Sequence, residues 1–259
     1  MNISNPLAVQ GRVIWALMLR EIHTIHGSSR LGYLWVLINN IVMLTFLWKI
    51  REILGFRPPH GMPVPTFLIS GYAVWGIVSG ITNRSISAVN GNRALLTFPQ
   101  VTPLDVMLAR VGVITATEVL VAAILLSVTV AAGYNQPSPD WGGVMGVILA
   151  SATLGLGLGT LLGALNVLFP VVERLTPIVF RFLFFVSGVF FSLRSVPYRF
   201  RDLLGYNPIL QLVEWSRLSL SPHYSAPDID TNYLIAVCLP LLTLGALLER
   251  YMRSQIAGV

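Results

Sequence analysis

The chain has 259 residues, of which 54% are hydrophobic and only 11% are charged, and its mean hydropathy is +0.72. A soluble globular domain carries about 25% charged residues, so this chain has too few to cover a water-exposed surface. Composition therefore excludes a soluble enzyme and a disordered chain, and the single cysteine, Cys238, excludes a disulfide-bonded scaffold. The sequence predicts an integral membrane protein.

The net charge of +6 comes from basic residues that are scattered over the loops. Sixteen of the seventeen are arginines, and the only lysine is Lys49. This scattering is typical of membrane anchoring rather than of a nucleic-acid interface, so we expect membrane lipids, and no nucleic acid, among the partners.

Six apolar stretches are long enough to span a membrane, because a helix needs about 20 mainly apolar residues to cross about 30 Å of hydrocarbon. No stretch shows the alternation of a barrel strand. We therefore expect an all-α fold with six transmembrane helices in a single domain, residues 1–259. The predicted spans are residues 31–50, 64–82, 106–132, 143–169, 175–193 and 233–248.

Residues 1–30 lack the pattern of a cleaved signal peptide and instead predict an amphipathic helix lying at the membrane surface. Its polar face carries Arg12, Arg20 and His23. The apolar residues that recur at helical spacing are Ile14, Leu17, Met18, Ile22 and Ile25. Six spans place both termini on one side, and a slight excess of basic residues in the inner segments favours the cytoplasm.

The longest loop, residues 194–232, lies between the fifth and sixth predicted spans and faces outward in this topology. Two short helices that re-enter the membrane face would fit its pattern, and a plain surface loop fits nearly as well. In the helical interpretation, Leu210 and Val213 enter the interface while Glu214 and Arg217 stay in water.

The chain lacks the residues that the common membrane enzymes require. A P-loop ATPase needs the lysine of its phosphate-binding motif, and Lys49 lies at the end of a span. The four histidines lie outside the apolar runs, and the acidic residues are almost all single. We expect no catalytic residue, no metal ion and no cofactor in this chain, which leaves a transport or channel role.

Two charged residues lie within predicted spans, Glu118 near the middle of the third and Arg181 about two turns into the fifth. A charge at the helix centre costs about 2.5–3.5 kcal/mol on insertion scales, so each should face protein or water. Arg181 shares a helix face with Phe184 and Phe185, which suits a path for an anionic, sugar-bearing substrate. A structural ion pair between Glu118 and Arg181 is an equally good interpretation.

Small residues in the fourth predicted span indicate close helix packing, within one subunit or between two. The glycines that stand four residues apart are Gly155, Gly159 and Gly163. Three asparagines within spans are most simply interhelical hydrogen-bonding residues: Asn39, Asn40 and Asn166.

Two segments resemble the membrane domain of ABC type-2 polysaccharide exporters. Residues 19–35 have an Arg-Glu-Ile helix, a short Gly/Ser break and then Leu-Gly-Tyr-Leu-Trp at the first span. Residues 92–105, Asn-Arg-Ala-Leu-Leu-Thr-Phe-Pro-Gln-Val-Thr-Pro-Leu-Asp, resemble the cytoplasmic coupling segment of these permeases. The resemblance covers essentially the whole chain, and it is strongest to the capsular polysaccharide export permeases of Gram-negative bacteria, of the group-two capsule type.

This resemblance implies a half-transporter in the bacterial inner membrane. Two permease copies would pair with two copies of a separate ATPase subunit, which would hold ATP and Mg²⁺. Lipid-linked, often acidic polysaccharide would pass from the inner face toward periplasmic and outer-membrane export proteins. In the family, the amphipathic helix and the segment after the second span dock on the ATPase. The coupling residues carried over to residues 83–105 are Arg93, Leu95, Leu96 and Phe98.

Four other arginines receive implied roles. Arg20 and Arg30, at the inner rim, would suit a lipid phosphate or an acidic sugar, and Arg199 and Arg201, in the outer loop, would suit the emerging polymer or a periplasmic adaptor. Ordinary anchoring at the interface is the alternative for all four. For the whole chain, the alternatives are export of another lipid-linked glycan or of a drug, and an ATP-independent channel or lipid flippase.

Overall fold

The computed structural model describes residues 6–26, 32–55, 61–87, 102–134, 138–221, 223–224 and 229–257. Within these residues every regular element is a helix, which confirms the all-α prediction. The helices are α1 (Pro6–His26), α2 (Gly32–Ile53), α3 (Val64–Ile86), α4 (Pro103–Ala131), α5 (Trp141–Leu168), α6 (Val171–Val186), the 3₁₀ turn η2 (Leu193–Ser195), α7 (Tyr198–Gly205), α8 (Pro208–Leu220) and α9 (Thr231–Ala257).

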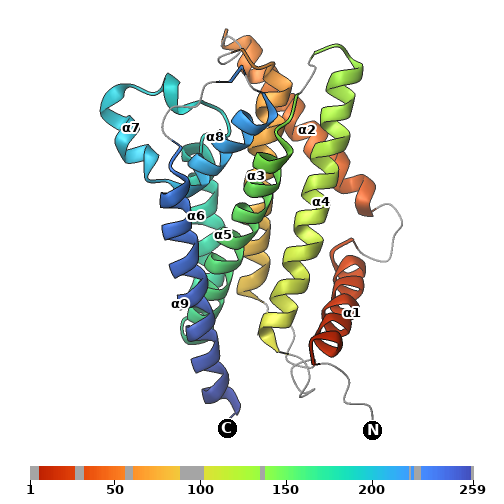
Figure 1. Cartoon of the computed structure of the whole chain (residues 1–259), viewed down its shortest axis with the longest axis vertical. Coiled ribbons are helices and arrows are strands. Elements are labelled where there is room, and N and C mark those ends of the chain that lie inside the picture. Colours follow the sequence, from red (N-terminus) through yellow and green to blue (C-terminus); the bar gives the residue numbers. More distant parts are fainter. Residues whose placement is uncertain are drawn as a thin grey trace.

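The long helices run up and down along the longest axis of the molecule (Figure 1). Helix α5 packs most extensively, against α3 on one side and α9 on the other. Helix α1 lies beside the lower part of α4, near the end of the bundle where α9 finishes, whereas α7 and α8 lie at the opposite end (Figure 1). The bundle thus has two unlike ends, one with α1 and the end of α9 and one with the short helices.

Helices occupy all six stretches predicted as spans. Four of them, α3, α4, α5 and α9, are long and apolar enough to cross a membrane. Helix α6 has 16 residues, about 24 Å at the usual rise per residue, against about 30 Å of hydrocarbon. The prediction that the fifth span continues to residue 193 is wrong, since α6 ends at Val186. There the chain turns at Gly188, whose φ of 74° favours glycine.

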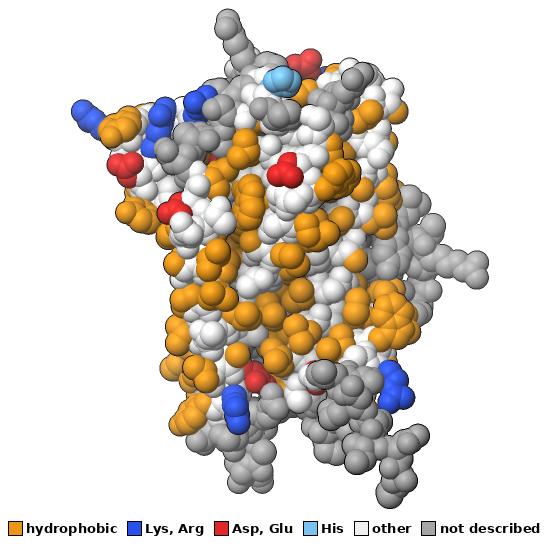
Figure 2. All heavy atoms as spheres, viewed as in Figure 1, with side chains coloured by type: hydrophobic (Ala, Val, Ile, Leu, Met, Phe, Trp, Pro, Cys, Tyr) orange, Lys and Arg blue, Asp and Glu red, His pale blue; other side chains and the backbone are white. Residues whose placement is uncertain are grey.

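Hydrophobic side chains cover the middle of the face shown in Figure 2, and arginine and lysine side chains lie toward its upper and lower ends. This distribution is the one expected of a bundle surrounded by hydrocarbon in the middle and by water at both ends.

The three glycines of α5 that stand four residues apart lie against α3 within the same chain. A Cβ atom on Gly159 would lie 2.6 Å from Ser85 Cβ, and one on Gly155 would lie 3.0 Å from Ile81 Cβ. The same face carries Gly163. The structure confirms the close packing predicted from the four-residue spacing and places it between α5 and α3.

The three asparagines of the spans have different environments. Asn166 Nδ2 donates to the carbonyl oxygen of Ile86 on α3 at 3.4 Å and to Glu173 Oε2 at 3.2 Å, which confirms its interhelical role. Asn39 is exposed. Asn40 is buried, and its Nδ2 has no hydrogen-bond partner in the described part of the chain.

Candidate functional site

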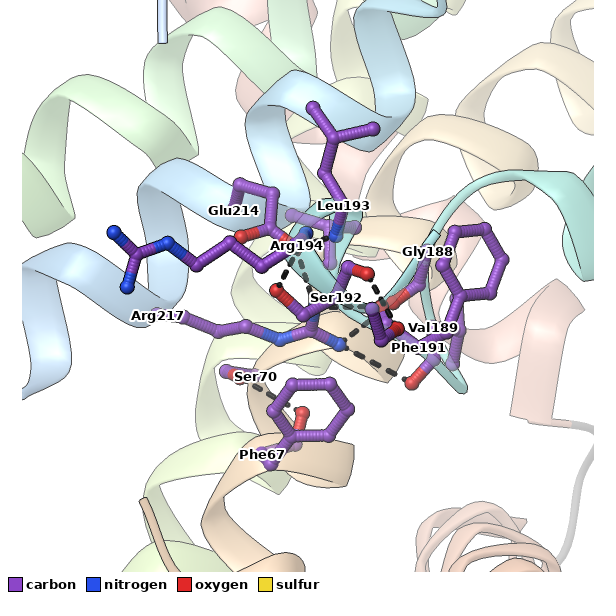
Figure 3. A network of polar contacts seen from close by, with 12 residues as sticks. Phe67, Ser70, Gly188, Val189, Phe191, Ser192, Leu193, Arg194, Glu214 and Arg217 are labelled. Atoms are coloured by element: carbon purple, nitrogen blue, oxygen red, sulfur yellow. Dashed lines mark hydrogen bonds and ion pairs between the residues drawn. The ribbon is translucent and has the colours of Figure 1, made fainter. Parts of the chain in front are cut away.

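A buried arginine fixes the chain where it leaves α6. The side chain of Arg217, on α8, is fully buried. Its Nη2 donates to the carbonyl oxygens of Gly188 at 2.7 Å and Val189 at 3.2 Å. Its Nη1 donates to the carbonyl oxygen of Phe191 at 3.1 Å and to Glu214 Oε1 at 3.1 Å (Figure 3). One guanidinium therefore holds three carbonyl groups of the turn that follows α6.

Glu214 is bound on its other side as well. Its carboxylate accepts hydrogen bonds from the backbone N–H of Leu193 at 3.2 Å and from the hydroxyl of Tyr224 at 2.6 Å. The Tyr224 hydroxyl oxygen also lies 2.9 Å from Ser192 Oγ. Burial raises the pKa of Tyr224 well above its ordinary value of 10, so the phenol stays protonated and continues to donate.

The ring of Phe67, on α3, lies close to two guanidinium groups. The Cζ atom of Arg217 lies 3.4 Å from the centre of the Phe67 ring, and that of Arg51, on α2, lies 5.1 Å from it. Arg51 Nη1 also donates to the carbonyl oxygen of Phe190. Cation–π contact of this kind is stabilising where water is excluded. Helices α2, α3 and α8 therefore hold residues 188–193 together, and we call this the Arg217 clamp.

The prediction that Glu214 and Arg217 stay in water is wrong: their exposed fractions are 1% and 0%. Burial of the two charges is possible because each one offsets the other, both Glu214 oxygens accept hydrogen bonds, and both terminal nitrogens of Arg217 donate them. In these two side chains, only Arg217 Nε is buried without a partner among the described residues. The sequence signal for this pair was its i, i+3 spacing on a helix that is otherwise largely apolar. The predicted interfacial residues Leu210 and Val213 are also buried inside the protein.

The residues predicted to line a substrate path lie on and beside α6. The side chain of Arg181 is exposed, Phe184 is buried and Phe185 is exposed. The Phe184 ring centre lies 5.2 Å from that of Trp75 on α3 and 4.9 Å from that of Phe190. The aromatic cluster formed by α3, α6 and the following turn comprises Tyr72, Trp75, Phe180, Phe184, Phe185 and Phe190.

Glu118, the other predicted path residue, projects from α4 toward α3. Its carboxylate occupies the space beside Gly76, where a Cβ atom would lie 2.6 Å from Glu118 Cδ. The ion pairs among the described residues do not include one between Glu118 and Arg181. The role of both residues in a path stays a prediction.

The remaining predicted residues lie at the two ends of the bundle. Arg20 is half-buried, with Nη2 3.7 Å from Glu21 Oε2. Arg199 is exposed on α7. Arg201 Nε donates to the carbonyl oxygen of Val196 at 2.8 Å. Five predicted residues lie outside the described part of the chain: Arg30, Arg93, Leu95, Leu96 and Phe98.

The part of the chain that the structure describes offers little for metal chemistry, since it brings no three His, Cys, Asp or Glu side chains together where they could hold an ion. What it offers is an apolar bundle with a clamped turn at one end and an exposed arginine beside aromatic rings.

Comparison with known proteins defines the class. The family model of the ABC-2 type transporter matches residues 12–220. The chain therefore belongs to this family, and it is a membrane subunit of a transporter, as the resemblance predicted.

Individual relatives cover nearly the whole chain. The polysialic acid transport protein KpsM of Escherichia coli is 31% identical over 242 residues, which are 93% of this chain and 94% of that protein. The capsule polysaccharide export inner-membrane protein BexB of Haemophilus influenzae is 24% identical over 255 residues, 98% of this chain and 96% of that protein. The capsule polysaccharide export inner-membrane protein CtrC of Neisseria meningitidis serogroup B is 24% identical over 256 residues, which cover 96% of this chain and 94% of that protein.

Proposed function

We propose that this chain is the permease subunit of an ATP-driven exporter that moves lipid-linked capsular polysaccharide across the bacterial inner membrane. The names of the relatives, which specify capsule polysaccharide or polysialic acid, support this substrate class. The chain has no P-loop lysine, so ATP and Mg²⁺ would be held by a separate ATPase subunit.

The observation that carries the proposal is the exposure of Arg181 on α6. A charged side chain at this depth costs about 2.5–3.5 kcal/mol if it faces lipid. Its cost falls if α6 faces a second copy of this chain across a water-filled path. A homodimer with two α6 helices toward such a path would place Arg181 where it could attract an acidic polymer.

The aromatic cluster beside Arg181 would add a surface of low specificity. Sugar rings lie flat on aromatic side chains, and Phe185 is exposed next to Phe190, with ring centres 5.6 Å apart and planes inclined by 17°. A long polymer that passes in many steps needs repeated weak contacts of this kind rather than one tight site.

Energy would enter from the cytoplasmic side, where we place both termini. ATP binding would draw the ATPase subunits together, and the permease helices would shift toward the packing that this closure favours. The contacts would be made by α1 and by the coupling residues Arg93, Leu95, Leu96 and Phe98. Arg20 and Arg30 would meet the lipid anchor at the inner rim.

At the other end of the path, the polymer would leave toward periplasmic and outer-membrane export proteins. Arg199 and Arg201 lie in this part of the chain, between α6 and α8. Exposed Arg199 would suit the emerging acidic polymer or a periplasmic adaptor.

Proteoliposomes that contain the permease and its ATPase test the proposal. Arg181→Ala should reduce ATP-dependent export of an acidic polysaccharide more than Arg181→Lys does, because lysine keeps the positive charge. Equal loss in the two variants, with less protein in the membrane, would instead indicate a structural role. Export by the permease alone, without an ATPase or nucleotide, would refute the function itself.

A further inference from the structure

One arginine joins three helices at the end of the bundle opposite the Arg217 clamp. Arg110, on α4, is largely buried, and its Nε donates to Glu21 Oε1 of α1 at 2.9 Å. Its Nη1 donates to the backbone carbonyl of Arg84, in the last turn of α3. Glu21 has an exposed fraction of only 4%. The guanidinium thus connects α1, α3 and α4 through two of its nitrogens.

The apolar side of α1 follows the same surface. Val13, Ile14, Leu17 and Met18 pack in one cluster with residues of α4. Met18 fits closely over Gly112 of α4, where a Cβ atom would lie 2.8 Å from the Met18 methyl carbon. The stripe that predicts a surface helix therefore contacts protein along this side.

A second polar contact ties α1 to the beginning of α4. Gln10 Nε2 donates to Asp105 Oδ1 at 3.1 Å. Asp105 and Thr102 form a capping box that fixes the first turn of α4. Helix α1 is thus attached both at the start of α4 and, through Glu21 and Arg110, about one and a half turns further along it.

These contacts lie where they can transmit a force between α1 and the ends of α3 and α4. The last turn of α3 and the first turns of α4 are the two described elements that flank residues 88–101, and α1 is fastened to both. A force that acts between these elements would reach α1 through the Glu21–Arg110 pair, and a force on α1 would reach both helices.

We propose that Glu21 and Arg110 are positioning residues for energy coupling, which join α1 to α3 and α4 so that the three move as one unit when the ATPase acts. This inference rests on the proposed function. A buried ion pair suits this task because it is directional and fixes the position of α1 along α4. An apolar contact alone would let α1 slide along α4.

The test uses the full permease with its ATPase in proteoliposomes and measures ATP hydrolysis and export of acidic polysaccharide separately. Glu21→Gln should leave the complex assembled and hydrolysing ATP, while export per ATP falls by about fivefold or more. Arg110→Lys keeps the charge but cannot bond Glu21 and the Arg84 carbonyl together, so it should give a smaller loss. The exchanged pair Glu21→Arg with Arg110→Glu restores the ion pair between α1 and α4 but has no donor for the Arg84 carbonyl, so it should regain only part of the coupling lost in Glu21→Gln.

The matched control is the exposed ion pair between Lys49 and Glu52 on α2, whose N–O distance is 2.7 Å. Glu52→Gln should leave export per ATP unchanged. The inference is overturned if Glu21→Gln keeps normal export per ATP, or if hydrolysis and export fall in proportion to the amount of folded complex and the exchange restores neither. If the unaltered complex shows no ATP-dependent export, the proposed function itself has failed, and the inference falls with it.

Discussion

Replacement of Arg217 by methionine removes the centre of the Arg217 clamp and leaves an unbranched apolar side chain in its place. The change leaves the Glu214 carboxylate buried without its cation, and it takes the donor from the carbonyl groups of Gly188, Val189 and Phe191. Loss of one partner from a buried ion pair costs about 3–5 kcal/mol. For a chain of this size, roughly 2–4 °C of melting temperature corresponds to each kcal/mol, so the expected fall is roughly 6–20 °C.

The assay is thermal unfolding of the detergent-solubilised chain, followed by the fluorescence of its six tryptophans. Arg194→Met is the matched control, since Arg194 is exposed and its variant should unfold near the normal temperature. The double variant Arg217→Met with Glu214→Gln should lose less unfolding free energy than the two single variants lose together. The difference should be about 1 kcal/mol or more, because the double variant has no uncompensated buried charge. An Arg217→Met variant as stable as Arg194→Met, or strict additivity, would refute the clamp.

Two further changes probe the close contacts between helices in the same unfolding assay. Gly159→Val should destabilise the chain by about 1–3 kcal/mol because its new side chain would collide with Ser85 Cβ. The control, Gly11→Ala, has open space around it and should be neutral or stabilising by up to about 1 kcal/mol. Similar melting temperatures for the two variants would contradict the packing of α5 on α3. Gly76→Val, whose larger side chain would displace the Glu118 carboxylate, should destabilise the chain. Adding Glu118→Ala should recover part of the loss, and no recovery would show that this contact is absent.

The helical part of the fold was predictable because long apolar runs in a membrane leave the backbone little choice other than a helix. The end of α6 was not predictable in the same way. The apolar sequence continues to residue 193, but the chain turns at Gly188 and its carbonyl groups bind Arg217, which lies 26 to 29 residues further along. A contact across such a distance leaves no periodic signal in the sequence.

The candidate site was predictable only in part, for a related reason. Hydropathy assigns charged residues such as Glu214 and Arg217 to water, and their burial depends on acceptors and donors supplied by another segment. In α1, the spacing of Leu17 and Met18 identified the apolar side, which the prediction placed against the membrane surface and which packs on protein instead. The identity of the surface that covers it, α4, required the three-dimensional arrangement.

The shortness of α6 also bears on the lipid that would border the proposed path between two copies of the chain. A helix of about 24 Å beside a hydrocarbon layer of about 30 Å creates hydrophobic mismatch, and bilayers respond to a short span by thinning locally, at a fraction of a kcal/mol per Å. Headgroups and water would then come closer to the midplane beside α6 than elsewhere around the bundle. A polar chain that crosses next to this helix would meet the narrowest part of the dielectric barrier.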